Sequence, residues 1–447
     1  MIIKYFSIVL RCTIVFALFL SFEWAFSQSS VNYSEHIAPI LYKNCISCHS
    51  PGQIAPFSLL TYKDAVRKAK TIKRVTESGY MPPWHADNSY SQLAHPLSLS
   101  QKQIEMIKKW VENGTPIGDT TKLLNPNTYL KRKIDKPDLV LKLPKIEIKG
   151  DNEEKFYQIK LPFQLPEAKQ VCRCEFVPGN PKVVHHMDAF LYNLTPQSNP
   201  FDGPQYVESN TFPTKTQLLE YLNIKNHNGG IAFPTKSTIL DFFPGSVSQT
   251  FPKGINRVFT MEQKGAFLID VMHYGGSPVA TVDTSKMYLY FCKEQPKRSI
   301  YNLSFGSPDQ NIEPELIIKP NQIQTHKTWM RFVKDISILS VQPHAHLICK
   351  SLKAYAITPE NKLIPLIKID HWDFRWQRVY KMKKMVRIPA NSKVYLEGVF
   401  DNTTNNVNNP YDPPQEIKES IRTKDEMLQL WVEFLPYQPG DENISLE

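Results

Sequence analysis

The chain contains the pentapeptide Cys45-Ile46-Ser47-Cys48-His49 close to its N-terminus. Two thiols separated by two residues and followed at once by a histidine form the attachment pattern of a covalent c-type haem. Cys45 and Cys48 would bond the porphyrin edge, and His49 would ligate the iron. The alternatives are a zinc site or a redox-active thiol pair. Zinc would need a second ligand pair nearby, and no further cysteine occurs before Cys172. The motif therefore predicts haem c.

Residues 31–119 have helical patterns on both sides of this motif. Ser34 is expected to cap a helix that runs into the haem motif. Ser100 and Gln103 form a capping box for a later helix, which Gly114 ends. Helices at both ends with haem ligands between them are the layout of a small cytochrome c, so residues 31–119 are predicted to be an all-α cytochrome c domain.

The second axial ligand of the iron is predicted to be Met81, because Pro82 and Pro83 stiffen the irregular segment that carries it. A core methionine at a turn is the alternative interpretation. His85 and His95 are rival ligands. Methionine ligation would raise the reduction potential relative to two histidines.

Residues 1–27 resemble a secretory signal, with Lys4 and Arg11 preceding and flanking an apolar stretch. Because the apolar stretch is short, it indicates cleavage rather than a stable membrane span. The protein is expected to be periplasmic or secreted, in a bacterium. This location permits disulfides. Four cysteines lie outside the haem motif and the signal: Cys172, Cys174, Cys292 and Cys349. The sequence leaves open which of them form disulfides with one another.

The formal net charge is +10. The basic residues are scattered, without a dense run or interleaved aromatic residues, which disfavours nucleic-acid binding.

The second part of the chain has a β-rich texture. Residues 120–138 are polar and aperiodic and are expected to be a linker. Short strand-like runs follow, such as 267–271 and 287–291, and turn residues interrupt them repeatedly. This texture predicts two antiparallel β-sandwich, jelly-roll-like domains, over 139–298 and 299–447. The predicted fold class is thus multidomain, an all-α domain followed by two sandwiches.

Five histidines in the β-rich part stand in two groups that suit a metal. His185 and His186 are adjacent, and His273 follows later. His344 and His346 form an H-x-H pair, which on a strand aims both imidazoles at one point. Adjacent histidines normally diverge, so His185 and His186 can share a metal only at a bend or through different ring nitrogens.

This set of residues resembles the copper type II, ascorbate-dependent monooxygenases, the family of peptidylglycine α-hydroxylating and dopamine β-monooxygenases. The resemblance implies two β-sandwich domains with two copper ions. The first copper would be held by the H-H pair and the later histidine, here His185, His186 and His273. The second would be held by His344, His346 and the downstream Met427.

Imidazole and thioether ligands suit copper that cycles between Cu(II) and Cu(I). The resemblance assigns oxygen activation and catalysis to His344, His346 and Met427, and electron storage to the first site. The reaction implied is hydroxylation of an organic substrate by O2. The alternative for Met427 is a strand-core residue, because Leu428 and Leu430 follow it.

The sequence departs from the family at the substrate-binding positions. The peptide hydroxylase holds its substrate's carboxylate with an arginine and a tyrosine, where this chain has Gln342 and Trp431. Glutamine lacks the charge and the fork that bind a carboxylate. The substrate, a small molecule or a peptide, is therefore expected to differ and remains unidentified.

The leading hypothesis is an exported copper monooxygenase whose fused haem relays electrons from an external donor to copper. A linker would let the haem reach the first copper at high effective concentration. Two other classes stay open: a non-catalytic cytochrome c electron-transfer protein on a β scaffold, and a copper-binding or copper-sensing module.

Other residues receive structural interpretations. Four histidines lack ligand-spaced neighbours and are expected to be surface or core residues: His36, His227, His326 and His371. Three aromatic residues alternate and are expected to share the core face of a strand: Trp372, Phe374 and Trp376.

Overall fold

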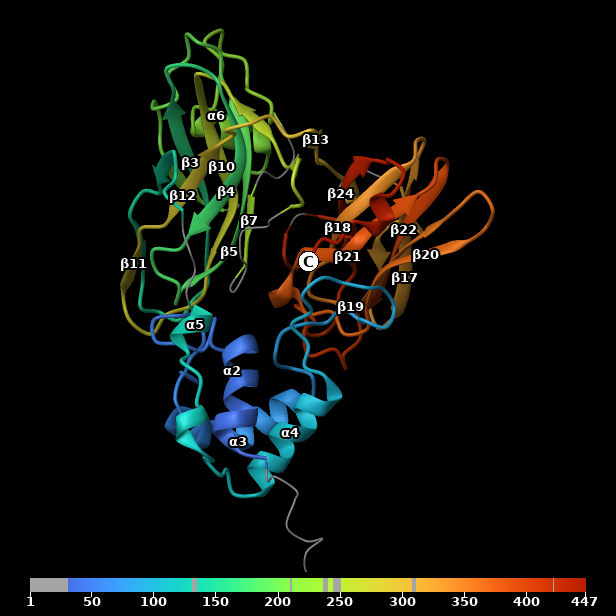
Figure 1. Ribbon diagram of the computed structural model, residues 1–447. Helices are drawn as coiled ribbons and strands as arrows, with labels where there is room; N and C mark the ends of the chain where they lie inside the picture. Colours follow the sequence, from blue (N-terminus) through green and yellow to red (C-terminus); the bar gives the residue numbers. More distant parts are fainter. Residues whose placement is uncertain are drawn as a thin grey trace, which may run out of the picture. The chain divides into compact units, whose positions relative to one another are not determined.

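The computed structural model describes residues 31–130, 135–209, 211–235, 240–243, 251–307, 311–420 and 422–447 (Figure 1). The expected signal, residues 1–27, lies outside the described residues. The chain divides into two compact units, each discontinuous in sequence. Unit 1 comprises Met1–Ile46, Leu59–Ser78 and Leu99–Leu130, and unit 2 comprises Ser47–Ser58, Gly79–Ser98 and Lys131–Glu447. None of the described helices is long and apolar enough to cross a membrane.

The described part of unit 1 is helical. Its elements are η1 (Tyr33–Ile37), α2 (Ala38–Asn44), α3 (Tyr62–Glu77), α4 (Gln101–Glu112), η2 (Thr120–Lys122) and α5 (Asn127–Leu130). Tyr33 and Trp110 are fully buried and their rings lie 6.0 Å apart. Helices of this length need such tertiary packing to be stable, because few of them would form in isolation. η2 and α5 lie in the segment expected to be a linker.

The helix starts follow capping rules. Gln103 N–H donates to the Ser100 hydroxyl and Ser100 N–H donates to the Gln103 side chain at 2.9 Å, which confirms the predicted capping box. The first helical segment starts differently from the prediction. Asn32, not Ser34, is its N-cap, and Glu35 N–H donates to the Asn32 side chain at 2.9 Å.

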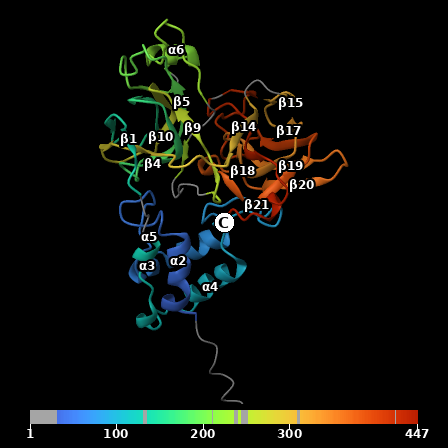
Figure 2. The same ribbon diagram turned by 45° about the horizontal axis from the view of Figure 1, so that its top comes forward.

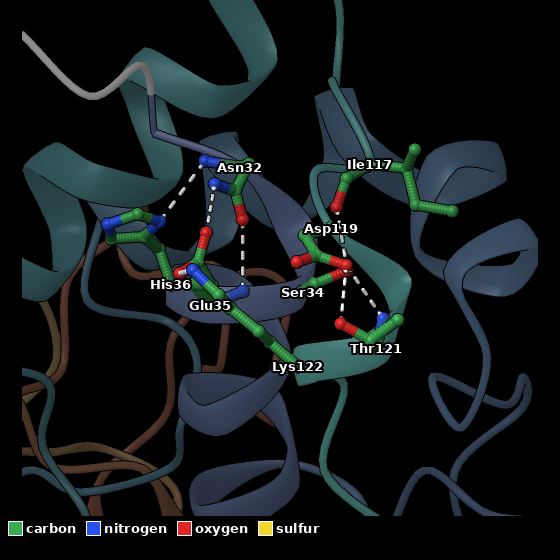
Figure 3. Close-up of polar contacts among 8 residues, drawn as sticks. All are labelled: Asn32, Ser34, Glu35, His36, Ile117, Asp119, Thr121 and Lys122. Atoms are coloured by element: carbon green, nitrogen blue, oxygen red, sulfur yellow. Dashed lines mark hydrogen bonds and ion pairs between the residues drawn. The ribbon is translucent and has the colours of Figure 1, made fainter.

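Ser34 instead links two distant segments of unit 1, as Figure 3 shows. It is fully buried, and its hydroxyl donates to the carbonyl of Ile117 at 2.8 Å. Lys122 forms an ion pair with Glu35 at 2.7 Å beside this contact, while Asp119 caps the η2 turn by accepting from Thr121. The buried serine therefore ties the start of the described chain to the segment after α4.

The prediction of an all-α domain over residues 31–119 is wrong, and with it the predicted fold class. The protein is mostly β, and Ser47–Ser58 and Gly79–Ser98 belong to unit 2. Ala86 forms a β-bridge with Ile369, and Leu93 forms one with Met382. The physical reason is burial: the proline-containing segment cannot continue a helix, and both bridging residues join the core of the C-terminal strands.

The first thirteen strands form the N-terminal β half. They are β1 (Leu139–Lys142), β2 (Ile146–Ile148), β3 (Lys155–Gln164), β4 (Lys169–Val177), β5 (Val184–Asn193), β6 (Tyr206–Glu208), β7 (Leu240–Phe242), β8 (Ile255–Asn256), β9 (Phe259–Met261), β10 (Lys264–Tyr274), β11 (Thr281–Asp283), β12 (Lys286–Phe291) and β13 (Arg298–Ser299). Helix α6 (Lys215–Tyr221) lies between β6 and β7.

Two larger sheets organise this half, with strand orders β1-β12-β4-β9 and β6-β3-β10-β5-β7. Their shared core takes Phe176 and Leu289 from the first sheet and Leu191 and Phe267 from the second. All pairings within these two sheets are antiparallel. The core therefore fixes β5 and β10 side by side at its centre, and these strands carry His185, His186 and His273.

The remaining strands form the C-terminal β half, coloured from orange to red in Figures 1 and 2. They are β14 (Tyr301–Gly306), β15 (Ile312–Glu313), β16 (Ile317–Ile318), β17 (Ile323–Phe332), β18 (Ile336–His344), β19 (Cys349–Ile357), β20 (Leu363–Ile369), β21 (Tyr380–Ile388), β22 (Ser392–Asp401), β23 (Ile417–Lys418) and β24 (Gln429–Pro436), with the turns η3 (Phe374–Trp376) and η4 (Asp441–Asn443). The larger sheets have the orders β14-β24-β18-β21 and β15-β17-β22-β19-β20.

Two cross-links within unit 2 matter for the site. A disulfide joins Cys172 on β4 to Cys292 just after β12. An ion pair joins Arg257 of the N-terminal half to Glu433 on β24 of the C-terminal half. Because Glu433 is only 5% exposed, the pair links the two halves at a buried point.

Candidate metal centres

The first histidine group lies where β5 and β10 pair with an irregular register. His186 lies directly opposite His273, but the next pair joins Val184 to Tyr274. His185 is therefore an extra residue on β5, a β-bulge. A bulge bends the strand and re-aims the side chain. This bend is what allows two adjacent histidines to face one point.

The ring nitrogens of this group converge. His186 Nδ1 lies 3.2 Å from His185 Nδ1 and 3.2 Å from His273 Nδ1. The candidate ligand atoms of the three residues all lie within 4.8 Å of one another. One ring nitrogen can make only one in-plane hydrogen bond, so hydrogen bonding alone does not satisfy the cluster. Two nitrogens bound to one metal at about 2.0 Å in a tetrahedral site lie about 3.3 Å apart, which matches this spacing.

Burial keeps these imidazoles neutral. Burial lowers the pKa of His273 to about 3, and the neighbouring His185 adds to the shift. Burial likewise lowers the pKa of His186 well below its ordinary value. The ring of Phe156 stacks on His273 at 4.2 Å, which fixes the plane of that imidazole. Neutral imidazole is the form that binds metals, so His185, His186 and His273 fit a metal ion.

The second histidine group lies at the end of β18. His344 is the last residue of the strand, and His346 follows two positions later. His344 Nδ1–H donates to the Gln377 side-chain oxygen at 2.5 Å, and His346 Nδ1–H donates to the carbonyl of Asp425 at 3.0 Å. Each bond fixes the tautomer and leaves the Nε2 atom as the available ligand. Burial also lowers the pKa of His344 to about 3, with His346 acting in the same direction.

Met427 is brought to this group by a buried carboxylate. Glu426 accepts from the backbone N–H groups of His346 at 2.8 Å and Met427 at 3.2 Å. The β18–β24 ladder pairs His344 with Gln429, and the same register continued by two residues brings His346 level with Met427. Met427 is 8% exposed. Two imidazoles and a thioether form a donor set that suits copper, especially Cu(I).

The residues of the predicted haem motif lie in the turn that follows α2 and directly after it. Cys45 is the C-cap of α2. Cys48 and His49 follow in unit 2. His49 Nδ1–H donates to the carbonyl of Phe57 at 3.0 Å, which leaves its Nε2 atom available. Neither cysteine takes part in the Cys172–Cys292 disulfide. These features fit the histidine ligand of a haem, and haem attachment itself stays a prediction.

The predicted second haem ligand, Met81, lies in the segment Gly79–Ser98. It is half-buried, between the exposed Tyr80 and the buried Pro82. The rival His85 has a buried Nε2 atom without a hydrogen-bond partner among the described residues. His95 adopts a left-handed backbone conformation with φ of 45°. Pairing of this segment with the strands around η3 anchors Met81 in unit 2.

Four residues near the histidines were missed as site residues by the sequence interpretation. Gln377 bonds His344, the Phe374 ring lies 5.6 Å from the His346 ring, and the Trp376 ring lies 6.5 Å from the His185 ring. Glu426 is the fourth. The prediction that Trp372, Phe374 and Trp376 share a strand face is wrong, because Phe374–Trp376 is a 3-10 turn. Asp373, which caps this turn, was the available signal.

Comparison with solved structures gives similarities at low sequence identity, including the following two. The VP2 subviral particle of infectious bursal disease virus is 8% identical with a TM-score of 0.18, over 71% of this chain and 75% of that chain. The PBSX exported protein XepA is 6% identical with a TM-score of 0.15, over 59% of this chain and 86% of that chain. TM-scores this low support no argument about fold or function. No curated protein matches the chain.

Comparison with protein families gives one match. Residues 300–437 match the model of the copper type II ascorbate-dependent monooxygenase C-terminal domain. The matched residues include His344, His346 and Met427, together with Gln377 and Glu426. The family is copper-dependent, and its members are oxidoreductases that use O2. The C-terminal β half is thus similar to the C-terminal domain of the copper type II ascorbate-dependent monooxygenases, and this similarity supports a copper monooxygenase-like function.

Proposed function

We propose that the protein is an exported copper-dependent monooxygenase that hydroxylates an organic substrate. The net reaction converts R–H, O2, two electrons and two protons into R–OH and water. The single observation that carries the proposal is the presence of two separate groups of neutral, half-buried to buried histidines in unit 2, the second of them within the family match. When bound, copper would supply oxygen activation at the second site and electron storage at the first.

The chain's own residues would hold and orient these ions. His185, His186 and His273 would offer three Nδ1 atoms, since these are the nitrogens that converge. His344 and His346 would offer Nε2, because Gln377 and the Asp425 carbonyl engage their Nδ1–H groups. Met427 would add a soft ligand that stabilises the reduced state.

The substrate is proposed to lack an anchoring carboxylate. Gln342 and Trp431 lie directly opposite each other on β18 and β24, two residues from the His344–Gln429 pair. Trp431 Nε1–H donates to the Gln429 side chain at 2.9 Å. A neutral amide and an indole at this place cannot pair with an anion as an arginine does. They suit a neutral group that accepts or donates hydrogen bonds.

Electron supply is proposed to come through a covalent haem held by Cys45, Cys48 and His49, with Met81 as the second ligand. The Cys172–Cys292 disulfide supports an oxidising location such as the periplasm, where disulfides persist. An external donor would reduce the haem. The anchoring of the Met81 segment in unit 2 supports a fixed position for this part of the haem site rather than repeated visits on a flexible linker.

The test is oxygen uptake by the full chain, matured in a host that attaches haem and then loaded with copper. We expect about two coppers and one haem per chain. We also expect reductant-dependent oxygen consumption that His344→Ala abolishes while the haem spectrum is kept. His227→Ala, an exposed histidine bonded to Thr195, is the control. Equal hydroxylation by copper-free protein would overturn the proposal, and copper loading without any oxygen uptake would favour the non-catalytic alternative.

A further inference from the structure

The short turn around η3 contacts ligands of both histidine groups. Phe374 packs against the His346 ring, Gln377 accepts from His344, and the Trp376 ring lies beside His185. The Phe374 and His346 rings meet at 82°, an edge-to-face arrangement. His185 belongs to the N-terminal β half and the other two histidines to the C-terminal half. One turn therefore lies against side chains of two sites.

The turn is firmly held at both of its ends. Trp372 is 7% exposed, and its Nε1–H donates to the carbonyl of His346 at 3.1 Å. Gln377, at the other end, is 8% exposed. Asp373 accepts from the backbone of Arg375 at 3.0 Å and forms a two-point ion pair with its guanidinium at 2.9 and 2.5 Å. A turn held in this way moves as one piece rather than residue by residue.

His185, in contrast, has few fixed contacts of its own. It is the bulge residue of β5, so no ladder partner lies opposite it. Its Nδ1 atom faces His186, and its ring lies 4.7 Å from the ring of His273. Copper binding would remove the remaining rotational freedom of this imidazole. The Trp376 ring beside it would lose freedom at the same time.

We propose that the Phe374–Gln377 turn couples the two sites, so that copper at the first site strengthens copper binding at the second. This inference rests on the proposed function in one respect, that both sites bind copper. Copper at the first site would fix the His185 imidazole and, beside it, the Trp376 ring. Because the turn moves as one piece, Phe374 and Gln377 would then be held in position against the ligands of the second site. Such coupling is reciprocal by thermodynamic necessity.

A double-mutant cycle isolates this coupling from direct repulsion between the two ions. The measured quantity is the second-site affinity for Cu(I), titrated into apo full-length protein against a competing chelator. The coupling factor is the ratio of this affinity in a protein with an intact first site to that in the same protein carrying His273→Ala. Repulsion between the two copper ions contributes equally to the coupling factor whether or not Trp376 is present. It therefore cancels when the coupling factor of the wild type is compared with that of a Trp376 variant.

We expect the coupling factor to fall about fivefold in the Trp376→Leu background, in the range found for residues that modulate coupling. Trp376→Phe, which keeps a ring beside His185, should retain most of it. Trp329→Leu is the matched control, because Trp329 lies on β17 and packs against Lys393 and Tyr395 instead. A second readout needs no activity: Cu(II) at the first site should quench tryptophan fluorescence less in Trp376→Phe than in the wild type.

The outcomes separate the two proposals. Two bound coppers with an unchanged coupling factor in Trp376→Leu would overturn the coupling and leave the proposed function standing. Failure of the wild type to bind copper at either site would overturn both. If Trp376→Leu loses its native circular dichroism, the decision rests on Trp376→Phe, where an undiminished fluorescence quench would contradict the contact with the first site.

Discussion

The two histidine groups use the same residue type in opposite ways. In the first, the Nδ1 atoms of His185, His186 and His273 face one another. In the second, the Nδ1–H groups of His344 and His346 are engaged by Gln377 and a backbone carbonyl, so the Nε2 atoms are left for a ligand. The hydrogen-bond partner of the remote nitrogen decides which nitrogen is available.

The strand context explains this difference. The first group lies within a ladder, where side chains have little room and a bulge must turn His185 toward its neighbours. The second group lies where β18 ends, so the chain after His344 is free to turn and to meet Asp425 and Glu426. A site within a sheet is therefore rigid through its backbone, whereas a site at a strand end depends on side-chain bonds.

The largest expected effect tests the first group. His273→Ala removes one of three converging nitrogens, and two ligands at a bulge hold copper poorly. We expect the bound copper to fall from about two ions to about one per chain, measured by elemental analysis after gel filtration. His227→Ala should keep both ions. Retention of two ions by His273→Ala would show that the convergence of these rings is not a metal site.

A smaller effect tests whether the stability of the N-terminal β half depends more on a disulfide than the stability of the C-terminal β half does. Its disulfide closes a segment with a sequence separation of 120 residues. The C-terminal half has Cys349 as a buried thiol outside any disulfide. Loss of a cross-link over so long a loop typically costs about 2–5 kcal/mol. We expect a double Cys172→Ser and Cys292→Ser variant to lose this much stability in urea unfolding.

The control for this measurement is the reductant itself. It should destabilise the wild type by the same amount and leave the double variant unchanged. If the reductant destabilises both proteins equally, the effect comes from elsewhere in the chain.

The smallest effect tests whether metal binding at the second histidine group depends on the side chain of Gln377. Gln377→Leu removes the acceptor that fixes the His344 tautomer, and loss of such a partner typically weakens metal binding about 10- to 100-fold. We expect this loss at the second site, and a smaller loss at the first site through the coupling turn, both measured by Cu(I) titration against a chelator. Gln377→Glu, which keeps an acceptor oxygen, should recover much of the affinity. Equal weakening of both sites by Gln377→Leu would contradict the assignment of Gln377 to the second site.

Local patterns in the sequence predicted local structure well. The Ser100–Gln103 capping box forms as expected, since both partners lie within one turn of the same helix. The short strand-like runs at 267–271 and 287–291 lie within β10 and β12. These features depend on residues that lie close together in the chain, so they can be predicted from the sequence alone.

Contacts between distant segments could not be predicted from local patterns. Serine is a residue type that often caps helices, but Ser34 is buried against Ile117 and its hydroxyl donates to that carbonyl instead. Ala86 and Leu93 pair with β20 and β21 instead of packing between helices, which is why an all-α domain does not form. Trp372, Phe374 and Trp376 alternate like strand residues, yet capping by Asp373 closes a 3-10 turn there. For Ser34, Ala86 and Leu93 a tertiary contact outweighs a weak local preference, whereas the turn after Asp373 follows from a local cap.

From the sequence alone, the candidate metal ligands could be named: three histidines in one group, and two histidines with a methionine in the other. How these side chains meet could be seen only in the folded chain. It supplies the bulge that turns His185, the carboxylate of Glu426 that links His346 to Met427, and the turn that brings Trp376 beside His185. The reason is that ligand chemistry belongs to single side chains, while convergence depends on strand register and on contacts between residues far apart in the chain.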